Sequence, residues 1–475
     1  MAITTTISDK AGERSVAMNS AQKLLVVLSA ANTINETQTT YRGQKVYGVS
    51  WAKTDTPLTR INASVGMVAN AGEGASTPTN DFDAAELFGD LEEYTDTLGN
   101  VFVKIPAHYI RKTDTASKKT WQVSKAKMPN SYKPWCFYDF TNNVWLDYVY
   151  VGKFVASESG GKLESKSGTF PLINKNIVDF RNYALANNTG GLSGYQQMDI
   201  HVYDMLQVLF TIEFATLNSQ AIMAGWTSGQ FNAAHALTAD TVAANTIVVA
   251  NTTGAAFAVG QPIGLGTAAG STSVFYGRNI TLIQADTPGA GSTTITVDGA
   301  VFSAVIGNVI WNCGWKNGFS SGIAASSGSL ANNTNGKNPF HYRRIENVWG
   351  NIWQFVDGIN INARQVWVCK NAAQFASNLF ASPYEQLGYV NKNADGYVKY
   401  MGYDAVLPFA EFPVDVSANF YKDYYYQNTG QYIAVVGGGW DYGGFAGLWL
   451  WALNNSSANA GAHVGGRLCA KEVSA

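Results

Sequence analysis

The sequence predicts a mostly β protein of the α+β class, and its composition gives three reasons. Aromatic residues make up 13% of the 475 residues, charged residues only 14%, and glycines number 47. Aromatic residues fit pleated sheets, whereas the solvated face of an amphipathic helix normally carries many lysines and glutamates. The hydrophobic fraction of 46% is large enough to fill real cores. We therefore expect strands to dominate, in a chain long enough for several domains.

The first 45 residues differ from the rest of the chain. A polar start precedes one predicted helix at residues 18–31, which contains the apolar run "KLLVVLSAA". This run is too brief for a coiled coil, and it lies too far inside the chain for an ordinary secretory signal. The sequence contains no stretch of about 18 apolar residues. We interpret residues 1–45 as an attachment or assembly segment and expect no membrane insertion.

Short strands are predicted from residue 46 onward, and residues 46–145 are interpreted as a β-rich region. In "NVFVKIPAHYIRK", Val101, Val103 and Ile105 alternate with Phe102 and Lys104. Such alternation places the two sets of side chains on opposite faces of a strand. The segment "WLDYVYVGKFVAS" continues the same pattern and begins the next predicted domain at residue 146.

One long helix is predicted at residues 199–220, with Asp199 as its N-cap. Apolar residues cover most of its circumference, which predicts that the helix is buried. Glu213 lies within this apolar segment. We interpret it as a structural carboxylate with a partner rather than as a catalytic acid.

Residues 231–312 have a composition of their own, rich in alanine, threonine, valine and glycine and poor in charge. Alternating segments such as "STTITVDGAVFSAV" predict strands, and the tryptophan-rich texture returns afterwards at "WNCGWKNG". Because the sequence on both sides resembles a single fold, we expect an inserted small β-domain. The larger domain then consists of residues 146–230 and 313–475.

The motifs that carry catalytic or cofactor chemistry are missing from the sequence. "GFSSG" at residues 318–322 has the letters of a nucleophile elbow, but it lies in a glycine- and serine-rich run without a preceding strand or a following helix. The four cysteines and five histidines lack the spacing of metal or redox sites. We expect buried free thiols, no catalytic residues, no metal and no cofactor. The absence of a basic cluster argues against nucleic acid as a partner.

Two motifs near the C-terminus resemble a known family. "GNIWQF" (residues 350–355) resembles the Gly-Asn-Val-Trp-Glu-Trp signature of the formylglycine-generating-enzyme type of C-type lectin fold, and "GGRLCA" (residues 465–470) resembles its closing Gly-Phe-Arg strand. The same marks occur in the variable proteins of diversity-generating retroelements, including phage major tropism determinants. The segments upstream are similar to phage tail-fibre and receptor-binding proteins. The resemblance implies a C-terminal C-type lectin-like fold, a homotrimer, and a place in the virion, at a tail fibre or tail tip beside other tail proteins, after synthesis in the host cytoplasm.

The sequence departs from the enzyme and sugar-binding branches of this fold. The catalytic cysteine pair of the enzymes is absent, because Cys469 has no cysteine nearby. The triplets with which C-type lectins bind calcium are absent as well. Both departures favour a binding protein that performs no catalysis.

The resemblance also gives a meaning to the aromatic, charge-poor segment 435–470. Variable proteins of this type keep a fixed scaffold and diversify the positions between its residues. Strand alternation predicts that Trp449, Trp451 and Leu453 face the core, while Leu448, Leu450 and Ala452 face a partner. The predicted ligand-binding, variable positions are Gly439, Asp441, Tyr442, Phe445, Leu450, Ala452, Gly461 and His463.

These observations predict a receptor-binding protein of a phage or prophage, whose C-terminal surface meets a protein or glycan on a bacterial cell. One alternative is an enzyme on a scaffold of the formylglycine-generating type. Another is a structural tail or baseplate component. In all three, Trp353 and Trp451 are expected to be largely buried.

Overall fold

The computed structural model describes residues 34–55, 57–188, 191–389, 394–404, 407–416 and 419–472. Within these ranges the chain is mostly β, with three α-helices: α2 (Ile177–Leu185), α3 (Ile200–Phe214) and α4 (Asn251–Gly254). The predominance of strands confirms the expectation from composition. The helix predicted at residues 18–31 lies outside the described residues. No helix in the described part is long and apolar enough to cross a membrane.

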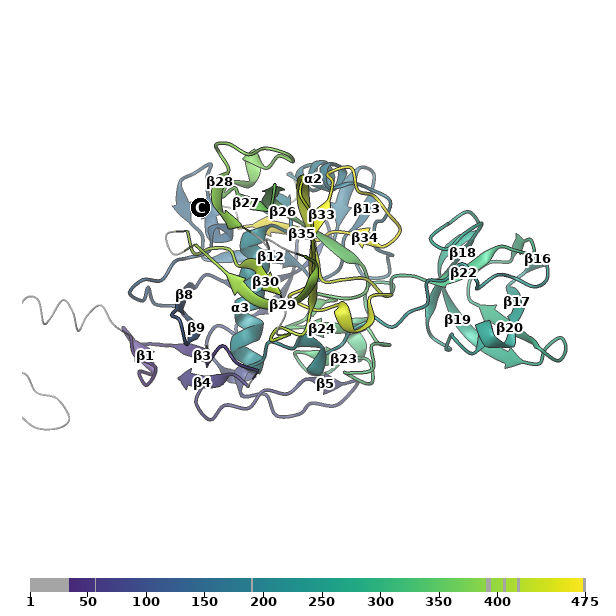
Figure 1. The fold of residues 1–475 in the computed structure, drawn as a ribbon, viewed down its shortest axis with the longest axis horizontal. Coiled ribbons are helices and arrows are strands. Elements are labelled where there is room, and N and C mark those ends of the chain that lie inside the picture. The colour runs from purple at the N-terminus through teal and green to yellow at the C-terminus, as the bar shows by residue number, and fades with distance from the viewer. Residues whose placement is uncertain are drawn as a thin grey trace, which may run out of the picture.

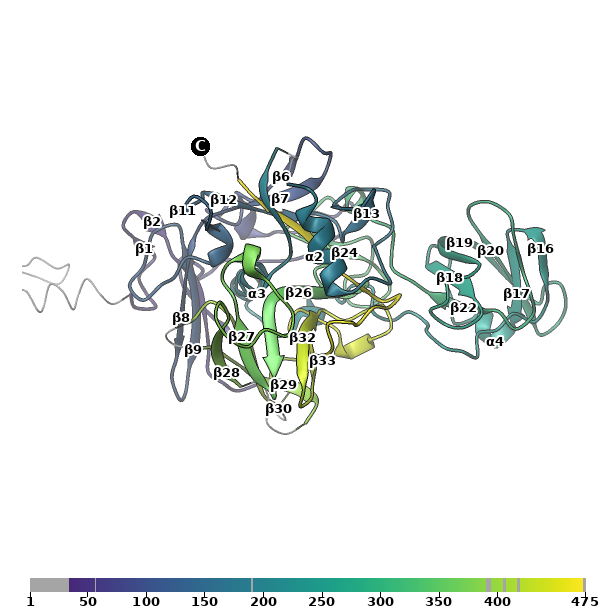
Figure 2. The same ribbon diagram turned by 90° about the horizontal axis from the view of Figure 1, so that it is seen from above.

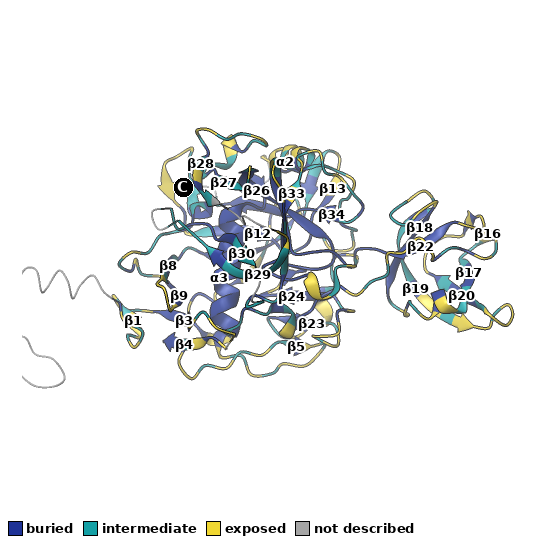
Figure 3. Cartoon of the chain, in the orientation of Figure 1, coloured by how far each residue is buried: buried dark blue, intermediate teal, exposed yellow. Residues whose placement is uncertain are grey.

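Helix α3 lies at the centre of the main body, and all of its residues are buried (Figures 1 and 3). Asp199 caps it as predicted, because its Oδ1 accepts a hydrogen bond from the Val202 amide at 2.9 Å. The helix ends at Phe214, earlier than predicted, since Ala215 adopts a left-handed conformation with φ of 50°. A four-stranded sheet of order β4-β3-β9-β8 packs against it. Its strands are β3 (Tyr47–Trp51), β4 (Thr59–Asn62), β8 (Tyr109–Asp114) and β9 (Lys119–Ser124).

A five-stranded sheet combines strands from the N-terminal part of the main body with the C-terminal strand β35, in the order β15-β35-β12-β7-β6. The C-terminal strand β35 pairs with both β12 and β15, and β12 pairs with β7. One apolar cluster contains residues from Tyr47 to Cys469. The segments on either side of the predicted boundary at residues 145 and 146 therefore share one hydrophobic core. The strands are β6 (Glu92–Thr95), β7 (Val101–Pro106), β12 (Tyr148–Gly152), β15 (Ser193–Gln197) and β35 (Leu468–Lys471).

The largest sheet carries the C-terminal segment between two apolar clusters. Trp449, Trp451 and Leu453 pack in the cluster around α3, whereas Leu450 and Ala452 pack in a second cluster that includes Phe180 of α2. The order is β28-β27-β26-β32-β33-β31-β29-β30, with β34 paired to β26. The strands are β26 (Trp353–Asn362), β27 (Gln365–Val368), β28 (Glu385–Tyr389), β29 (Gly396–Gly402), β30 (Phe412–Val416), β31 (Tyr424–Gln427), β32 (Gln431–Val436), β33 (Trp451–Asn455) and β34 (Val464–Gly465).

Shorter strands complete the main body. One small sheet has the order β25-β24-β23-β5, and three further pairs of strands form two-stranded sheets, β1-β2, β10-β11 and β13-β14. Their bounds are β1 (Thr40–Tyr41), β2 (Gln44–Lys45), β5 (Gly72–Glu73), β10 (Tyr138–Asp139), β11 (Val144–Trp145), β13 (Ser157–Ser159), β14 (Lys162–Glu164), β23 (Gly328–Ser329), β24 (Phe340–Tyr342) and β25 (Ile345–Glu346).

Residues 231–312 project from the main body as a separate lobe (Figures 1 and 2). The lobe contains a sheet of order β17-β20-β19-β18-β22, a β16-β21 pair, and an apolar cluster that lies wholly between Leu237 and Ile310. Its two ends lie side by side, because the Gln230 amide donates to Asn312 Oδ1 at 2.7 Å. The strands are β16 (Thr241–Ala244), β17 (Thr246–Ala250), β18 (Pro262–Gly266), β19 (Phe275–Ala285), β20 (Ser292–Val297), β21 (Phe302–Ala304) and β22 (Val309–Asn312).

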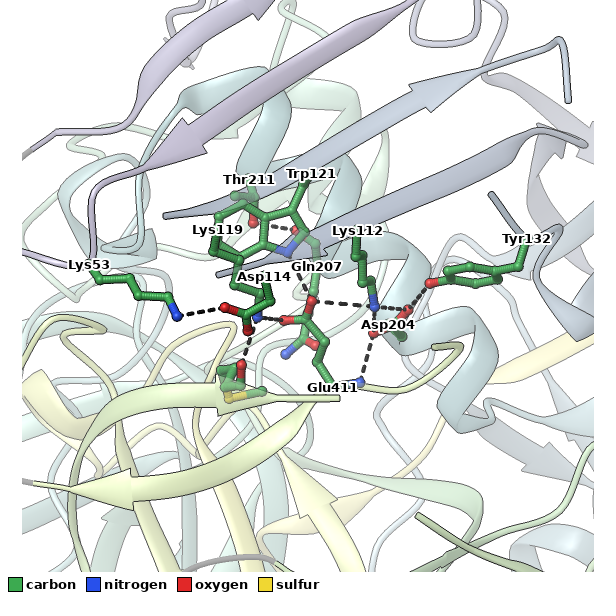
Figure 4. Close-up of polar contacts among 11 residues, drawn as sticks. Lys53, Lys112, Asp114, Lys119, Trp121, Tyr132, Asp204, Gln207, Thr211 and Glu411 are labelled. Carbon is green, nitrogen blue, oxygen red and sulfur yellow. Dashed lines mark hydrogen bonds and ion pairs between the residues drawn. The ribbon is translucent and has the colours of Figure 1, made fainter. Parts of the chain in front are cut away.

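Charged groups inside the main body form closed structural networks. Lys112 Nζ lies 2.7 Å from Asp204 Oδ1, and Lys119 Nζ lies 3.0 Å from Glu411 Oε2. Figure 4 shows these four side chains with Trp121, whose indole N–H donates to Glu411 at 2.9 Å. Two ammonium groups thus face two carboxylates, so each charge of this network has a partner of opposite sign. The network ties β8 and β9 to α3 and to the start of β30.

The interpretation of Glu213 as a paired structural carboxylate is confirmed. Arg343 binds it through two nitrogens, at 2.8 Å to Oε2 and 2.6 Å to Oε1, and Asn80 donates to Oε1 at 2.9 Å. This bidentate geometry suits a buried guanidinium–carboxylate pair. The four cysteines are buried free thiols, as expected.

Candidate binding site

Six aromatic rings from the largest sheet and from the loop between β32 and β33 form a continuous array, which we call the aromatic surface. Ring centroids lie 4.6 Å apart for Trp353 and Tyr442, 6.3 Å for Tyr442 and Tyr426, and 4.9 Å for Tyr426 and Tyr424. The array continues from Tyr424 to Phe445 at 4.9 Å and to Tyr397 at 5.3 Å. Five of the six rings are partly or largely exposed, whereas Trp353 is 3% exposed. The members are Trp353, Tyr397, Tyr424, Tyr426, Tyr442 and Phe445.

Strand geometry explains how several of these rings come together. In β31, Tyr424 and Tyr426 are half-buried, whereas the intervening Tyr425 is wholly buried, because successive side chains point to opposite faces. Strand β31 pairs in parallel with β33 and antiparallel with β29, which carries Tyr397. The sheet therefore presents tyrosines from two strands that lie outside the C-terminal segment 435–470.

The remaining exposed rings belong to residues 437–447, which we call the binding loop. Its first two glycines, Gly437 and Gly438, have φ of 86° and 81°, a conformation that other residues rarely adopt. A Cβ on Gly437 would lie 3.1 Å from the Trp349 backbone. Further along, the Gly443 amide donates to the Thr227 carbonyl at 2.7 Å. The loop is thus held at its start and near its middle, and Tyr442 and Phe445 reach the surface.

A groove of about 250 Å³ adjoins the aromatic surface. Aromatic faces and side-chain amides dominate its wall, so it can stack on a ligand and exchange hydrogen bonds with it. The groove is smaller than the roughly 300–1,000 Å³ of pockets for drug-sized ligands, so it suits one side chain or one sugar unit. Its lining comprises Trp353, Tyr426, Val435, Tyr442, Ala452, Asn454, Asn455, Asn459, His463 and Val464.

Burial keeps most titratable groups of the groove uncharged. It lowers the pKa of His463, although the nearby Asp441 opposes this effect, so the imidazole is neutral at neutral pH. Burial, with a smaller contribution from Asp441, raises the pKa of Tyr442, and burial raises the pKa of Tyr426 to about 12. Both phenols therefore keep their protons and can donate hydrogen bonds.

Most of the predicted variable positions lie on or beside this site. Asp441 and Phe445 are exposed, and Tyr442, Gly461 and His463 are partly exposed. Ala452 is only 4% exposed but contributes to the groove wall. Gly439 is buried, and a Cβ there would lie 3.4 Å from Trp353 Cδ1, so its Cα faces the base of the site.

The prediction that Leu450 faces a partner is wrong. Leu450 is 0% exposed and packs in the second apolar cluster. Alternation holds within β33, where Trp451 and Leu453 pack in the first cluster and Ala452 in the second. It fails at Leu448, which was expected to share a face with Leu450 but packs in the first cluster with Trp449, because residues 448–450 precede the strand. Both sides of this sheet are covered. The expected division into one core face and one partner face therefore fails, and the binding loop supplies the surface instead.

The sequence did not predict most residues of the aromatic surface and the groove. Asn454 and Asn455 are not among the predicted variable positions, yet both line the groove. The repeated tyrosines of "YYYQ", read as a strand, contain the signal for Tyr424 and Tyr426. No local pattern marks Tyr397, because only the pairing of β29 with β31 brings it close. The residues not predicted as site positions are Trp353, Tyr397, Tyr424, Tyr426, Val435, Asn454, Asn455, Asn459 and Val464.

Other motifs and the comparisons add no chemistry to this site. Residues 319–322 of "GFSSG" form one 3-10 turn, and the Gly318 and Ser320 amides donate to the buried Glu346 carboxylate at 3.0 and 2.9 Å. Across the described ranges, no three His, Cys, Asp or Glu side chains gather in a way that could hold a metal ion.

No protein-family model matches the chain, and no curated protein is significantly similar to it.

Proposed function

We propose that this chain is a receptor-binding protein of a phage or prophage, which recognises a protein or glycan on a bacterial cell and performs no catalysis. The continuous aromatic surface is the observation that carries this proposal. Contiguous exposed apolar patches on folded proteins commonly mark interaction sites, and tyrosine and tryptophan are enriched among the residues that dominate binding energy. The rigid sheet beneath these rings lowers the entropy lost on binding.

Packing between the two recognised motifs supports a C-type lectin-like fold for the C-terminal region. The Arg467 guanidinium of "GGRLCA" is buried and donates to the carbonyls of Glu346 and Asn347 at 2.6 and 3.0 Å. It also donates to Gln354 Oε1, within "GNIWQF", at 3.0 Å. The two segments that carry the resemblance therefore depend on each other for their hydrogen bonds.

The placement of the variable positions supports diversification by a retroelement. Exposed positions such as Asp441 and Phe445 tolerate changes of side-chain volume that a packed core does not. The flanking DNA tests this part of the proposal. A near-copy of the codons for residues 435–470, beside a reverse-transcriptase gene and differing mainly at adenines, is the expected finding. Its absence would contradict diversification without affecting the binding proposal.

We further propose that the protein acts as a homotrimer in the virion, at a tail fibre or tail tip beside other tail proteins, and is made in the host cytoplasm. The implied lectin-like fold motivates this placement. Detection of the chain in purified particles by mass spectrometry is the expected result.

Binding to intact cells tests the function itself. The fluorescently labelled full chain is applied to the bacterial strain whose genome carries the gene or, for a free phage, to its propagation host. Tyr442→Ala and Phe445→Ala are each expected to weaken binding by about 2 kcal/mol, or roughly thirtyfold, as hot-spot truncations do. Trp145→Ala is a matched control, because Trp145 is 43% exposed and Phe445 is 41% exposed.

Two outcomes would contradict the proposal. Unchanged cell binding by the double variant of Tyr442 and Phe445 would place the receptor site elsewhere. Failure of particle assembly together with unchanged cell binding would assign the aromatic surface to contacts with other tail proteins. Measurement on the isolated protein as well as on particles is needed, because multivalency hides weak single-site effects.

A further inference from the structure

We propose that the inserted lobe, residues 231–312, is a support for the binding loop, and that Trp311 and Phe231 are positioning residues for ligand recognition. The part that concerns recognition rests on the proposed function. The mechanical part does not, because it concerns only how the lobe holds residues 437–447. An insert that projects from the body would otherwise be taken for an independent spacer.

Trp440 is the point at which the lobe meets the binding loop. It lies between the predicted variable positions Gly439 and Asp441 and is 0% exposed. Its ring packs against Trp311 of the lobe, with centroids 5.8 Å apart and planes inclined by 32°, and Phe231 lies 6.4 Å away. The groove residue His463 lies 6.4 Å from the same ring, edge-on. One buried indole thus contacts both the lobe and the site.

Backbone contacts lock the root of the lobe to this loop. The Gly229 amide donates to the Trp440 carbonyl at 2.6 Å, and the Trp440 amide donates to the Asn351 carbonyl at 3.0 Å. A Cβ on Gly229 would lie 3.0 Å from Trp440 Cδ1 and equally close to Asn312 Cβ. No side chain fits between the loop and the root, so the two segments are in direct contact.

Trp311 is itself held firmly by the lobe. Its indole N–H donates to the Ser271 carbonyl at 3.2 Å, and Tyr276 packs against it with ring centroids 5.8 Å apart. A Cβ on Gly264 would lie 2.5 Å from Trp311 Cζ2, so the strand β18 touches the flat face of the indole. The position of Trp311, and through it that of Trp440, therefore follows the fold of the lobe.

The consequence for recognition is pre-organisation. A loop that is already ordered loses less conformational entropy when it binds, and its ligand binds more tightly for the same contacts. Removing the Trp311 ring frees one side of Trp440, and the adjacent residues Gly439 and Asp441 gain mobility. Tyr442 and Phe445 then present their rings in several orientations instead of one.

Hydrogen exchange in the full chain tests the mechanical part without any ligand. In Trp311→Ala, the amides of residues 439–445 are expected to exchange about tenfold faster or more, since local opening of the loop becomes easier. Amides of β17 and β20 report in the same experiment whether the lobe stays folded. Trp311→Phe, which keeps a ring against Trp440, is expected to restore slow exchange. Leu282→Ala, at a side chain of the lobe that is 46% exposed, is the control.

Cell binding completes the test. Trp311→Ala is expected to weaken binding roughly fivefold, and Trp311→Phe to recover most of it. Phe231→Ala decides the matter if Trp311→Ala unfolds the lobe, because Phe231 lies outside the lobe's apolar cluster. Unchanged exchange in residues 439–445 by a folded variant would overturn the proposal. Faster exchange, with cell binding unaffected even by Tyr442→Ala, would instead refute the proposed function and leave the mechanical part standing.

Discussion

The ring of Tyr442 stands edge-on against Trp353, with centroids 4.6 Å apart and planes at 85°. Trp353 is 3% exposed and belongs to the second apolar cluster, whereas Tyr442 is partly exposed and lines the groove. A ring offered to a ligand therefore rests on a ring that belongs to the core. Truncation of the two residues is expected to have different effects, and this difference separates the scaffold from the surface.

Trp353→Ala and Trp451→Ala are each expected to lower the free energy of unfolding by about 3–5 kcal/mol, the usual cost of emptying a large aromatic core site. Trp451 is 0% exposed and packs against Tyr203 of α3 with centroids 5.5 Å apart. Phe445→Ala, at the exposed end of the array, is expected to stay within about 0.5 kcal/mol of the unsubstituted chain. Urea unfolding followed by fluorescence measures all three. Unchanged midpoints for both tryptophan variants would show that the core is wrongly assigned.

Leu450→Ala tests whether Leu450 is a core residue, as the structure shows, or a ligand-facing residue, as the sequence predicts. Because Leu450 is wholly buried, its truncation is expected to cost about 2–5 kcal/mol of stability. A Cβ on Gly438 would lie 2.8 Å from Leu450 Cδ2, so this side chain also supports the start of the binding loop. Thermal unfolding of Leu450→Ala beside Phe445→Ala gives the comparison. A stable Leu450→Ala variant with impaired cell binding would restore the original prediction of an exposed, ligand-facing leucine.

Local patterns in the sequence predicted the parts of the fold that local physics determines. Helix α3, its Asp199 cap and the burial of Trp353 and Trp451 follow from periodicity and side-chain type. Alternation along β33 shows which residues share a face, but it cannot show that α2 and its neighbours cover the second face. Alternation within "YYYQ" could have placed Tyr424 and Tyr426 on one face of β31. Tyr397 has no such local signal, because only the pairing of β29 with β31 brings it beside them.

Asp423 is expected to make stability depend on pH. Its carboxylate is buried, Oδ2 accepts a hydrogen bond from the Trp449 amide at 2.7 Å, and Oδ1 has no partner among the described residues. Burial raises the pKa of Asp423 to about 8, whereas an unfolded chain gives about 3.9. Between these values the folded state holds one proton more than the unfolded state. The contribution of Asp423 to stability therefore falls as pH rises from about 4 to about 8 and levels off above.

Asp423→Asn isolates this contribution, because the amide carries no charge and its oxygen can still accept from Trp449. Relative to the unsubstituted chain, the variant is expected to gain stability as pH rises, with the largest gain near pH 8 to 9. Urea unfolding of both proteins from pH 5 to pH 9 measures the difference. A difference that stays constant over this range would mean that Asp423 is ionised in the folded state throughout.

Deletion of residues 231–312 is expected to leave the main body folded. The two large apolar clusters of the body contain no residue from this range. Gln230 is hydrogen-bonded to Asn312, the residue before Cys313, so the ends to be joined lie close together. A short Gly/Ser linker from Gln230 to Cys313 therefore introduces little strain. Near-ultraviolet circular dichroism and a cooperative unfolding transition are the expected signs of an intact body.

The deletion also removes Trp311, which packs against Trp440. Its effect on binding is therefore expected to differ from the effect of deleting a spacer that makes no contact with the binding loop. Loss of that contact is expected to speed amide exchange in residues 439–445 and to weaken cell binding at least as much as Trp311→Ala does, while α3 and β33 keep their slow exchange. A shortened lobe that retains β18, β19 and β22 preserves the Trp311 environment and is the matched control. Aggregation of the deletion product, or loss of its near-ultraviolet signal, would show that the body requires the lobe in order to fold. Full binding by a folded deletion product would show that the loop holds its shape without the lobe.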